Sequence, residues 1–292
     1  MTLTRALLLS NRTAGSSDDK LVAKIADVLS DGYDVVDASP AGSSELDTVL
    51  SSFDGERIIV AGGDGSLHVL INALANLGRL SDVVVGLVPL GTGNDFALGL
   101  GLPADPVDAA RACLDGTSTA VDLIVADDGE HITNAAHAGI GAVAAERAQT
   151  TKPIAGQWAY PLGAIQAAVT ESGYEVTLRL DDEPIYEGTM LLTLVANGPC
   201  IGGGTRLCTN ADPHDGLLDV LVIEALPLLE RPGLGLDIQR GTHLERSDVR
   251  YWRGHHLEID GHDINHNRDG ELRHALDDVR YTIQPAAWRL LR

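Results

Sequence analysis

The chain has 292 residues, 44% of them hydrophobic, and carries 42 acidic against 21 basic side chains, for a formal net charge of −21. This length suits two domains or one large one, and a surface this acidic excludes binding along a nucleic-acid backbone. The three cysteines lack any CxxC spacing, which is typical of a protein from a reducing cytoplasm. The acidity suits a salt-adapted host, where salt screens the repulsion, but an acidic proteome at ordinary salt explains it as well.

The first residues, MTLTRALLLS, contain a short apolar run with one arginine and no small-residue cleavage site. We therefore expect this run to be the first strand and not a signal peptide. No apolar run in the sequence approaches the length of a membrane span.

Strands and helices alternate over the first 126 residues. We expect strands at 5–10, 33–36, 58–60, 83–88 and 120–126, and helices at 20–29, 45–50, 67–74 and 106–114. Such βαβ alternation favours a parallel sheet with its ligand beyond the carboxyl ends of the strands. We expect residues 1–126 to form a nucleotide-binding α/β domain.

The remaining residues, 127–292, predict a β-rich second domain, because turn-forming sequences such as Asp127–Glu130 and Asp181–Pro184 separate short strands. The expected strands are 131–138, 174–180, 189–196, 217–223, 249–251, 255–259 and 280–283, with a helix-like segment at 162–170. We expect a sandwich or barrel-like domain whose last strand returns to the first domain.

A glycine loop, Gly62-Gly63-Asp64-Gly65-Ser66, follows an apolar strand and precedes a helix-spaced pattern. Glycines let the main chain approach a phosphate closely, and a helix N-terminus attracts its charge. A carboxylate in the loop repels phosphate unless a cation lies between them, so Asp64 indicates a nucleoside triphosphate with Mg²⁺ held through Asp64 or its waters. The alternative is a tight turn with Ser66 as the helix N-cap.

A second polar loop, PLGTGNDFA at 89–97, leaves the next strand at the same expected edge of the sheet. The alternative here is a simple helix start capped by Asn94 or Asp95. The pairing with the glycine loop about 30 residues upstream favours a shared site.

Five ordered motifs carry a family resemblance. They are GGDGS at 62–66, PLGTGNDFA at 89–97, ITNAAHAGIGAV at 132–143, the stretch from NGPCIGGG to ADPHDGLLDV within 197–220, and DGE at 269–271 followed by PAA at 285–287. The chain resembles the diacylglycerol kinase catalytic family, in its soluble prokaryotic lipid kinase branch, which is related to sphingosine kinases and NAD kinases.

The resemblance implies an NAD kinase-like α/β domain followed by a β-sandwich-like domain, with the active site in the cleft between them. It implies transfer of the ATP γ-phosphate to a lipid hydroxyl with Mg²⁺, by default from diacylglycerol to phosphatidic acid in phospholipid biosynthesis. The implied location is the cytoplasm, with transient contact to the membrane that holds the lipid. A homodimer is left open.

The resemblance also assigns roles to residues of this sequence. It assigns nucleotide binding to Asn11, Gly15, Gly62, Gly63, Asp64, Gly65, Ser66 and Thr92. It places Asp64, Asp95 and Asp122 around the catalytic Mg²⁺, and it draws the general base from Asp269 and Glu271, with Asp269 slightly preferred. It assigns Asp212, Asp215 and Leu217 to a second, structural Mg²⁺ site. Arg12 and Ser66 depart from the family pattern, and neither removes a group that the chemistry needs.

Two other functions remain open: an NAD kinase-like enzyme with a soluble acceptor, and a catalytically silent nucleotide-binding regulator. Trp158, Tyr160, Leu162 and Ile165 suit either core packing or contact with a bilayer. Four histidines between His255 and His266 fit no compact zinc motif, and their polar neighbours predict a solvated loop.

Overall fold

The computed structural model describes residues 3–10, 16–139 and 173–292. Two compact units are present: Met1–Leu123 together with Pro285–Arg292, and Ile124–Gln284. The chain passes from one unit to the other within β5 (Ser118–Ala126) and returns within β17 (Val279–Leu291).

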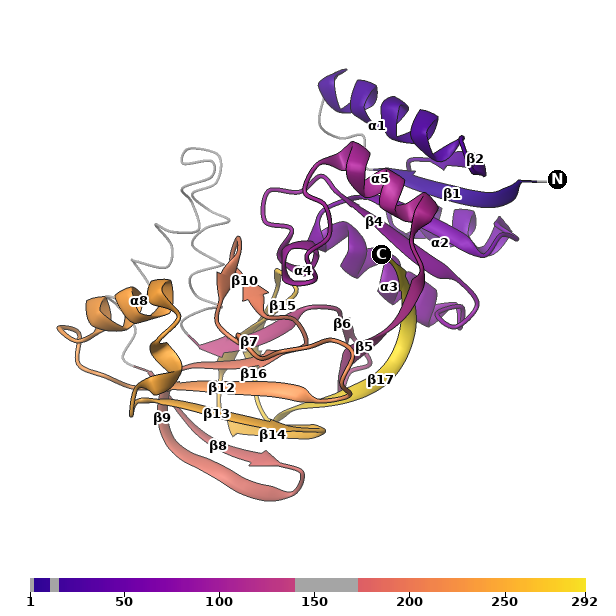
Figure 1. The fold of residues 1–292 in the computed structure, drawn as a ribbon. Helices are drawn as coiled ribbons and strands as arrows, with labels where there is room; N and C mark the ends of the chain where they lie inside the picture. The colour runs from indigo at the N-terminus through magenta and orange to yellow at the C-terminus, as the bar shows by residue number, and fades with distance from the viewer. Residues whose placement is uncertain (1–2, 11–15, 140–172) are drawn as a thin grey trace. The chain divides into compact units, whose positions relative to one another are not determined.

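The first unit is an α/β fold with a parallel sheet (Figure 1). Before β5, its elements are β1 (Thr4–Ser10), α1 (Ser16–Leu29), β2 (Tyr33–Ala38), α2 (Ser43–Ser52), β3 (Arg57–Gly62), α3 (Asp64–Asn76), β4 (Val84–Pro89), α4 (Asp95–Gly99) and α5 (Pro106–Asp115). The strand order is β4-β3-β1-β2, and the end of β17 joins β4 in parallel at Leu290 and Val85.

Apolar side chains cover both faces of this sheet because helices pack on both. Leu7 and Leu9 of β1 belong to the core that includes residues of α2 and α3. Ala6 and Leu8, which alternate with them, belong to the core that includes residues of α1 and α5. The unbroken apolar runs of the sequence are therefore strands buried on two sides.

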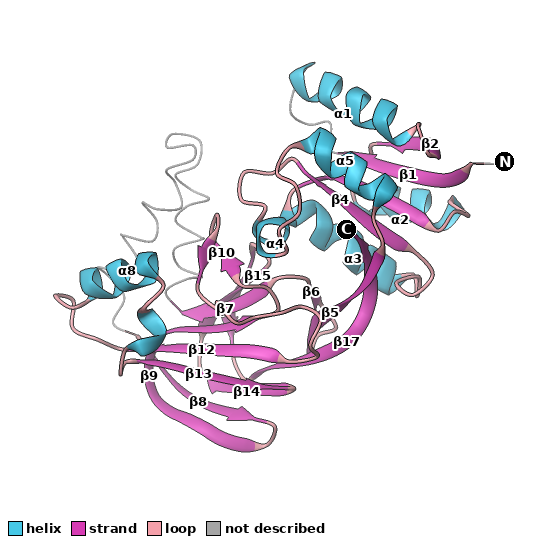
Figure 2. Cartoon of the chain, viewed as in Figure 1, coloured by secondary structure: helices cyan, strands magenta, loops and turns pink. Residues whose placement is uncertain are grey.

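The second unit is mostly antiparallel β structure, and Figure 2 shows α8 as its one α-helix in the described part of the chain. Its elements between β5 and β17 are β6 (His131–Ile132), β7 (Ala135–Gly139), β8 (Tyr174–Leu180), β9 (Glu183–Ala196), β10 (Cys200–Ile201), β11 (Thr205–Arg206), β12 (Leu218–Glu224), α8 (Arg231–Arg240), a 3₁₀ helix (His243–Glu245), β13 (Val249–Gly254), β14 (His256–Gly261), β15 (Ile264–Arg268) and β16 (Glu271–Leu276).

The strands of this unit follow the order β16-β15-β7-β9-β8-β14-β17, and β9 also pairs with β12, which pairs with β13. One buried cluster includes Leu178, Val195 and Ile259, and a second includes Leu194 and Leu221 with Leu234 of α8. Within the described residues, no helix is both long enough and apolar enough to cross a membrane.

The sequence prediction of a solvated loop around the C-terminal histidines holds at His262, which is 89% exposed between β14 and β15, but it is wrong at His266. Residues 264–268 form β15, which pairs with β16 on one side and with β7 on the other. His266 is therefore in an inner strand and only 1% exposed. The polar residues around His266 suggested an exposed loop. They are buried because β15 pairs with β7, a strand far away in the sequence.

Two histidines of this unit are buried in a neutral state. Burial lowers the pKa of His266 to about 3, helped by the positive charge of Arg268, and burial lowers the pKa of His137 to about 4. The hydroxyl of Tyr281 forms a hydrogen bond of 2.9 Å with Nδ1 of His266. The unfolded chain holds histidine near pKa 6.5, so it binds more protons than the folded chain below that pH.

The free energy of unfolding should therefore be highest above about pH 6.5 and should decrease as the pH falls below that value. Each of these histidines should lower it by about 1.4 kcal/mol at pH 5.5. We expect His266→Gln to shrink the difference in unfolding free energy between pH 7.5 and pH 5.5, measured by urea denaturation. His262→Gln is the control, because that imidazole is 89% exposed. An unchanged difference in the His266 variant would contradict the neutral burial of His266.

Candidate functional site

The two glycine loops of the first unit lie against each other. They follow β3 and β4, which pair in parallel up to Gly62 and Pro89, and the N–H of Leu90 donates to the carbonyl of Gly62 at 3.0 Å. A Cβ at Gly91 would lie 2.7 Å from the Cα of Gly63, so this approach excludes a side chain at Gly91. The expected convergence of both loops on one edge is therefore present in the structure.

Asp64 joins the two loops through its carboxylate. Its Oδ2 accepts the N–H of Asp95 at 2.9 Å, and its Oδ1 accepts the N–H of Phe96 at 3.1 Å. These two amides open α4, so a residue of the first loop caps the helix of the second. Carboxylate acceptors make such bonds stronger than neutral ones.

Both helix-cap alternatives drawn from the sequence differ from the structure. Helix α3 begins at Asp64 after an N-cap at Gly63, so Ser66 lies inside the helix. Asn94 is the N-cap of α4 with φ +52, but its side chain makes no cap bond. Its amide instead brackets Gly91, accepting from the N–H at 3.0 Å and donating to the carbonyl at 2.8 Å.

A small gap at Gly93 offers oxygen ligands to a cation. A Cβ at Gly93 would lie 3.6 Å from Oδ2 of Asp64 and 3.6 Å from Oδ2 of Asp95. Two carboxylate oxygens near one position fit the hard-oxygen preference of Mg²⁺. No group of three or more His, Cys, Asp or Glu side chains forms a ready-made metal site among the described residues.

Asp122, the third predicted acid, is buried in β5 and only 3% exposed. Its Oδ1 accepts the N–H of Ala286 at 2.7 Å. Ala286 has φ +51, so the carboxylate holds β17 at a backbone position that is unusual for alanine. This contact gives Asp122 a structural role within the first unit.

The described residues of the first unit line the two hollows considered next. One, of about 190 Å³, is lined by Thr92, Gly93 and Asn94 of the second loop together with apolar side chains that include Leu98 and Leu102. It is smaller than the roughly 300–1,000 Å³ of a typical ligand pocket, so it could hold only part of a nucleotide. Thr92 itself is exposed.

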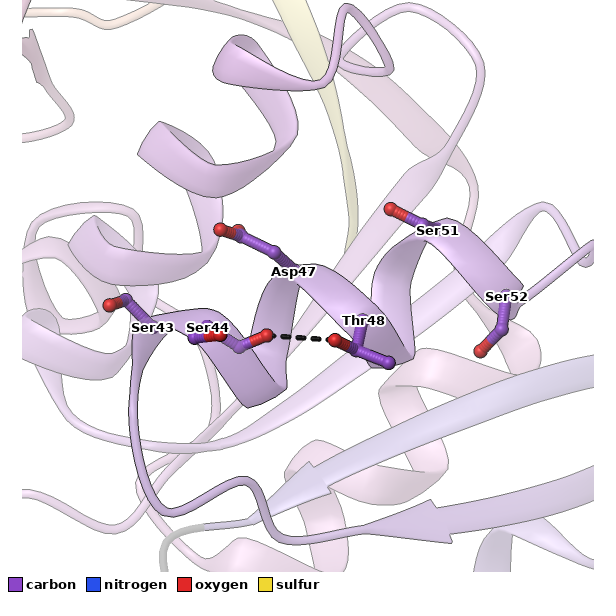
Figure 3. A pocket seen from close by; sticks show the side chains of 6 residues that line it. All are labelled: Ser43, Ser44, Asp47, Thr48, Ser51 and Ser52. Carbon is purple, nitrogen blue, oxygen red and sulfur yellow. Dashed lines mark hydrogen bonds between the residues drawn. The ribbon is translucent and has the colours of Figure 1, made fainter.

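The other hollow, of about 630 Å³, lies along one face of α2 (Figure 3). Small polar side chains line it, and its one charged group is the carboxylate of Asp47. It includes no residue of either glycine loop. We therefore assign no role to it.

In the second unit, Asp269 is held by four hydrogen bonds. Its Oδ2 accepts from the N–H and hydroxyl of Thr133 at 2.6 and 2.8 Å, and its Oδ1 accepts from the N–H groups of Asn134 and Ala135 at 2.9 and 3.0 Å. Asp269 also has φ +48 at the turn between β15 and β16. Its carboxylate thus ties this turn to the segment before β7.

Glu271, two residues on, opens β16 and is exposed. Its carboxylate makes no hydrogen bond or ion pair with the described part of the chain. Of the two acids in the DGE motif, Glu271 is therefore the one whose carboxylate is exposed to solvent.

An arginine and glutamate network that the sequence did not predict anchors the same hairpin. Arg268 is 1% exposed and donates from Nη1 to Asp128 at 2.6 Å and to Glu130 at 2.8 Å. Glu130 also accepts from Nη2 of Arg273 at 2.7 Å. The residues are more than 135 positions apart, so no local pattern in the sequence could have indicated the contact.

The predicted second metal site lies before β12, where Asp212 and Asp215 are exposed. The N–H of Leu217 donates to Oδ1 of Asp215 at 3.1 Å, and Arg253 binds Oδ2 of the same carboxylate. Asp219 is fully buried next to them, and burial raises its pKa to about 6 against the opposing charge of Arg253.

Several predicted residues lie outside the described part of the chain. These are Asn11, Arg12, Gly15, Trp158, Tyr160, Leu162 and Ile165, together with the 162–170 helix and most of the GIG segment. Their predicted roles stay predictions.

Comparison with known proteins places this geometry in a family. The diacylglycerol kinase catalytic domain matches residues 5–126, and the YegS C-terminal NAD kinase beta sandwich-like domain matches residues 134–292. A "Probable lipid kinase YegS-like" of Shewanella frigidimarina is 30% identical over 234 residues, which cover 79% of this chain and 74% of that protein. The diacylglycerol kinase of Bacillus subtilis is 27% identical over 237 residues, which cover 80% and 76%.

Solved structures share the fold. A diacylglycerol kinase structure from Bacillus anthracis matches with a TM-score of 0.74 at 20% identity, covering 100% of this chain and 97% of that chain. An NAD kinase from Archaeoglobus fulgidus in complex with ATP matches with a TM-score of 0.55 at 11% identity, covering 99% and 94%.

The two units therefore define a kinase with an NAD kinase-like fold, an α/β catalytic domain followed by a β-sandwich-like domain. The chain belongs to the family of bacterial lipid kinases that includes the YegS-like proteins and the diacylglycerol kinases. The expected family and fold class are confirmed.

The different surroundings of the two DGE acids predict different effects on stability. Asp269→Asn replaces a carboxylate that accepts four hydrogen bonds with an amide whose NH₂ faces N–H donors, so we expect a loss of roughly 2–3 kcal/mol in unfolding free energy. Glu271→Gln, on an exposed side chain, should change it by less than about 0.5 kcal/mol. Denaturant unfolding of both variants tests this, and equal losses would contradict the described contacts.

Proposed function

We propose that this protein transfers the γ-phosphoryl group of ATP to the hydroxyl of a membrane lipid, converting diacylglycerol to phosphatidic acid. The observation that carries the proposal is the pair of glycine loops locked together by Asp64, inside a chain of the lipid kinase family. Diacylglycerol is chosen as the acceptor because it is the substrate named for relatives such as the Bacillus subtilis protein.

The nucleotide phosphates would bind at the N-terminus of α3. The backbone N–H groups of Gly63 and Gly65 lie at the start of this helix, where they and the helix dipole favour negative charge. The N–H of Ser66 already donates to the carbonyl of Gly63 at 3.0 Å, so Ser66 would contribute its hydroxyl. Thr92 of the second loop would bind the nucleotide from the adjoining hollow. Asn11 and Gly15 are proposed to assist from the loop after β1.

Asp64 and Asp95 would hold Mg²⁺ at the gap beside Gly93, and the bound ion would offset charge on the phosphates. The two N–H groups that open α4 fix the position of the Asp64 carboxylate next to Asp95. Asp122 acts more remotely in this proposal, by fixing Ala286 of β17.

The proton of the acceptor hydroxyl is proposed to pass to Glu271. The new bond joins the lipid oxygen to the γ-phosphorus, the bond to the β–γ bridging oxygen breaks, and ADP leaves. Asp269, which was slightly preferred from the sequence, is already saturated with donors and is proposed to position the hairpin. The expected cleft between the two units stays a prediction.

Incubation with radiolabelled ATP and a panel of acceptors tests the function. Diacylglycerol, an ether-linked glycerol lipid, a sphingoid base, a ceramide, NAD and water are offered separately. We expect label in phosphatidic acid. Label in NADP would instead indicate the soluble-acceptor alternative, and nucleotide binding without transfer to any acceptor would indicate a silent regulator.

Glu271→Gln should lower turnover by about 10²-fold or more, the range for losing a general base, while ATP affinity stays as in the wild type. Turnover is read from lipid phosphorylation and affinity from nucleotide titration. Glu187→Gln, a change on another exposed glutamate of the same unit, is the matched control. Normal turnover in the Glu271 variant would place the base elsewhere.

Asp64→Asn should keep the fold, because the amide oxygen can still accept one of the two helix-opening N–H groups. We expect activity to fall by about 10²-fold, since charge stabilisation at the phosphates is lost. Circular dichroism checks the fold, and Asp47→Asn on α2 serves as the control. Activity near that of the wild type at saturating Mg²⁺ would refute the role of Asp64.

A further inference from the structure

Three acids lie within eight residues at the start of β12: Asp212, Asp215 and Asp219. Asp219 is 0% exposed, and a buried carboxylate is stable only when a positive group or several donors meet it. The family resemblance places a Mg²⁺ ion beside this segment, held by the carboxylate of Asp215 between the backbone carbonyls of Asp212 and Leu217. The structure contains a different source of positive charge.

That source is Arg253, and the sheet itself positions it. Arg253 in β13 is the registered antiparallel partner of Asp219 in β12, which places both side chains on one face. Its Nε lies 3.2 Å from Oδ1 of Asp219, and its Nη2 donates to Oδ2 at 3.5 Å. The same Nη2 also donates to Oδ2 of Asp215. One guanidinium therefore bridges the buried and the exposed carboxylate.

Two further donors complete the arrangement. The hydroxyl of Tyr251, two residues before Arg253 in β13, donates to Oδ1 of Asp219. The N–H of Leu217 donates to Oδ1 of Asp215 at 3.1 Å. Each of the four oxygens on these two carboxylates thus has a donor from the protein.

A Mg²⁺ ion fits this donor set poorly. It requires several oxygen ligands in a near-octahedral shell at about 2.1 Å, with lone pairs directed at the metal. At Asp64 both donors are neutral backbone amides, but at Asp215 one donor is the positive guanidinium of Arg253. A dication at Asp215 would therefore lie beside an existing positive charge. The backbone carbonyl of Asp212 is itself engaged, since it accepts the N–H of Asp215 at 3.3 Å.

We propose that Arg253 is the built-in counter-cation of this acidic segment, so that the second unit folds without a metal ion at residues 212–217. Its guanidinium does there what a structural Mg²⁺ would do, and it does so at any Mg²⁺ concentration. The divalent-cation requirement of the chain is then confined to the nucleotide. The proposal rests on contacts within the second unit alone and stands apart from the identity of the lipid acceptor.

Thermal unfolding of the full chain without nucleotide tests this proposal. A bound ion stabilises the folded state by mass action, so a metal at Asp215 would raise the midpoint as Mg²⁺ increases. We expect the midpoint to change by the same amount between EDTA and millimolar Mg²⁺ in the wild type and in Asp215→Asn. A rise that disappears in Asp215→Asn would overturn the proposal.

The matched pair Arg253→Gln and Arg250→Gln tests the arginine itself. Both residues lie in β13, but Arg250 makes a surface ion pair with Glu224 at 2.8 Å. Arg253→Gln leaves the buried carboxylate of Asp219 without its positive partner and should lower the unfolding midpoint by roughly 10 °C. Arg250→Gln removes only a surface ion pair and should lower the midpoint by about 2 °C or less. Equal small shifts would overturn the proposal.

If Arg253→Gln fails to fold, Mn²⁺ binding followed by electron paramagnetic resonance still decides the question. Wild type and Asp215→Asn are titrated with Mn²⁺ in the absence of nucleotide. We expect the same number of bound ions in both proteins. One ion fewer in the Asp215 variant would show that residues 212–217 hold a metal after all.

Discussion

The structure depends on carboxylates that accept backbone N–H groups across long stretches of chain. Asp64 accepts the two amides that open α4, and Asp269 accepts the amides of Asn134 and Ala135. In the first unit Asp64 thereby fixes the loop before α4, and in the second unit Asp269 fixes the segment before β7. An anionic acceptor makes these bonds strong, so the loops are positioned before any ligand binds.

The two acids of the DGE motif have different surroundings, although only Gly270 separates them in the sequence. Asp269 accepts four hydrogen bonds, whereas Glu271 is exposed. Asp269 is therefore held in one position by the backbone, whereas the side chain of Glu271 reaches the solvent.

A chain of net charge −21 also needs internal cations where its acids meet. Arg268 meets Asp128 and Glu130, and Arg253 meets Asp215 and Asp219. The planar guanidinium of arginine reaches two carboxylates at once, which the point charge of lysine does less well. Arginine supplies 18 of the 21 basic residues, and one of them, Arg268, is buried where it meets its carboxylate partners.

The sequence by itself determined the α/β half, its glycine loops and the family, because buried parallel strands and glycine turns leave local patterns. It also located the DGE motif. Only the tertiary structure decided that β15 is an inner strand, that Asp64 caps a helix in the next loop, and that Arg253 faces Asp219. These features depend on strand register and on contacts between distant residues, and neither has a signature in any short window of sequence.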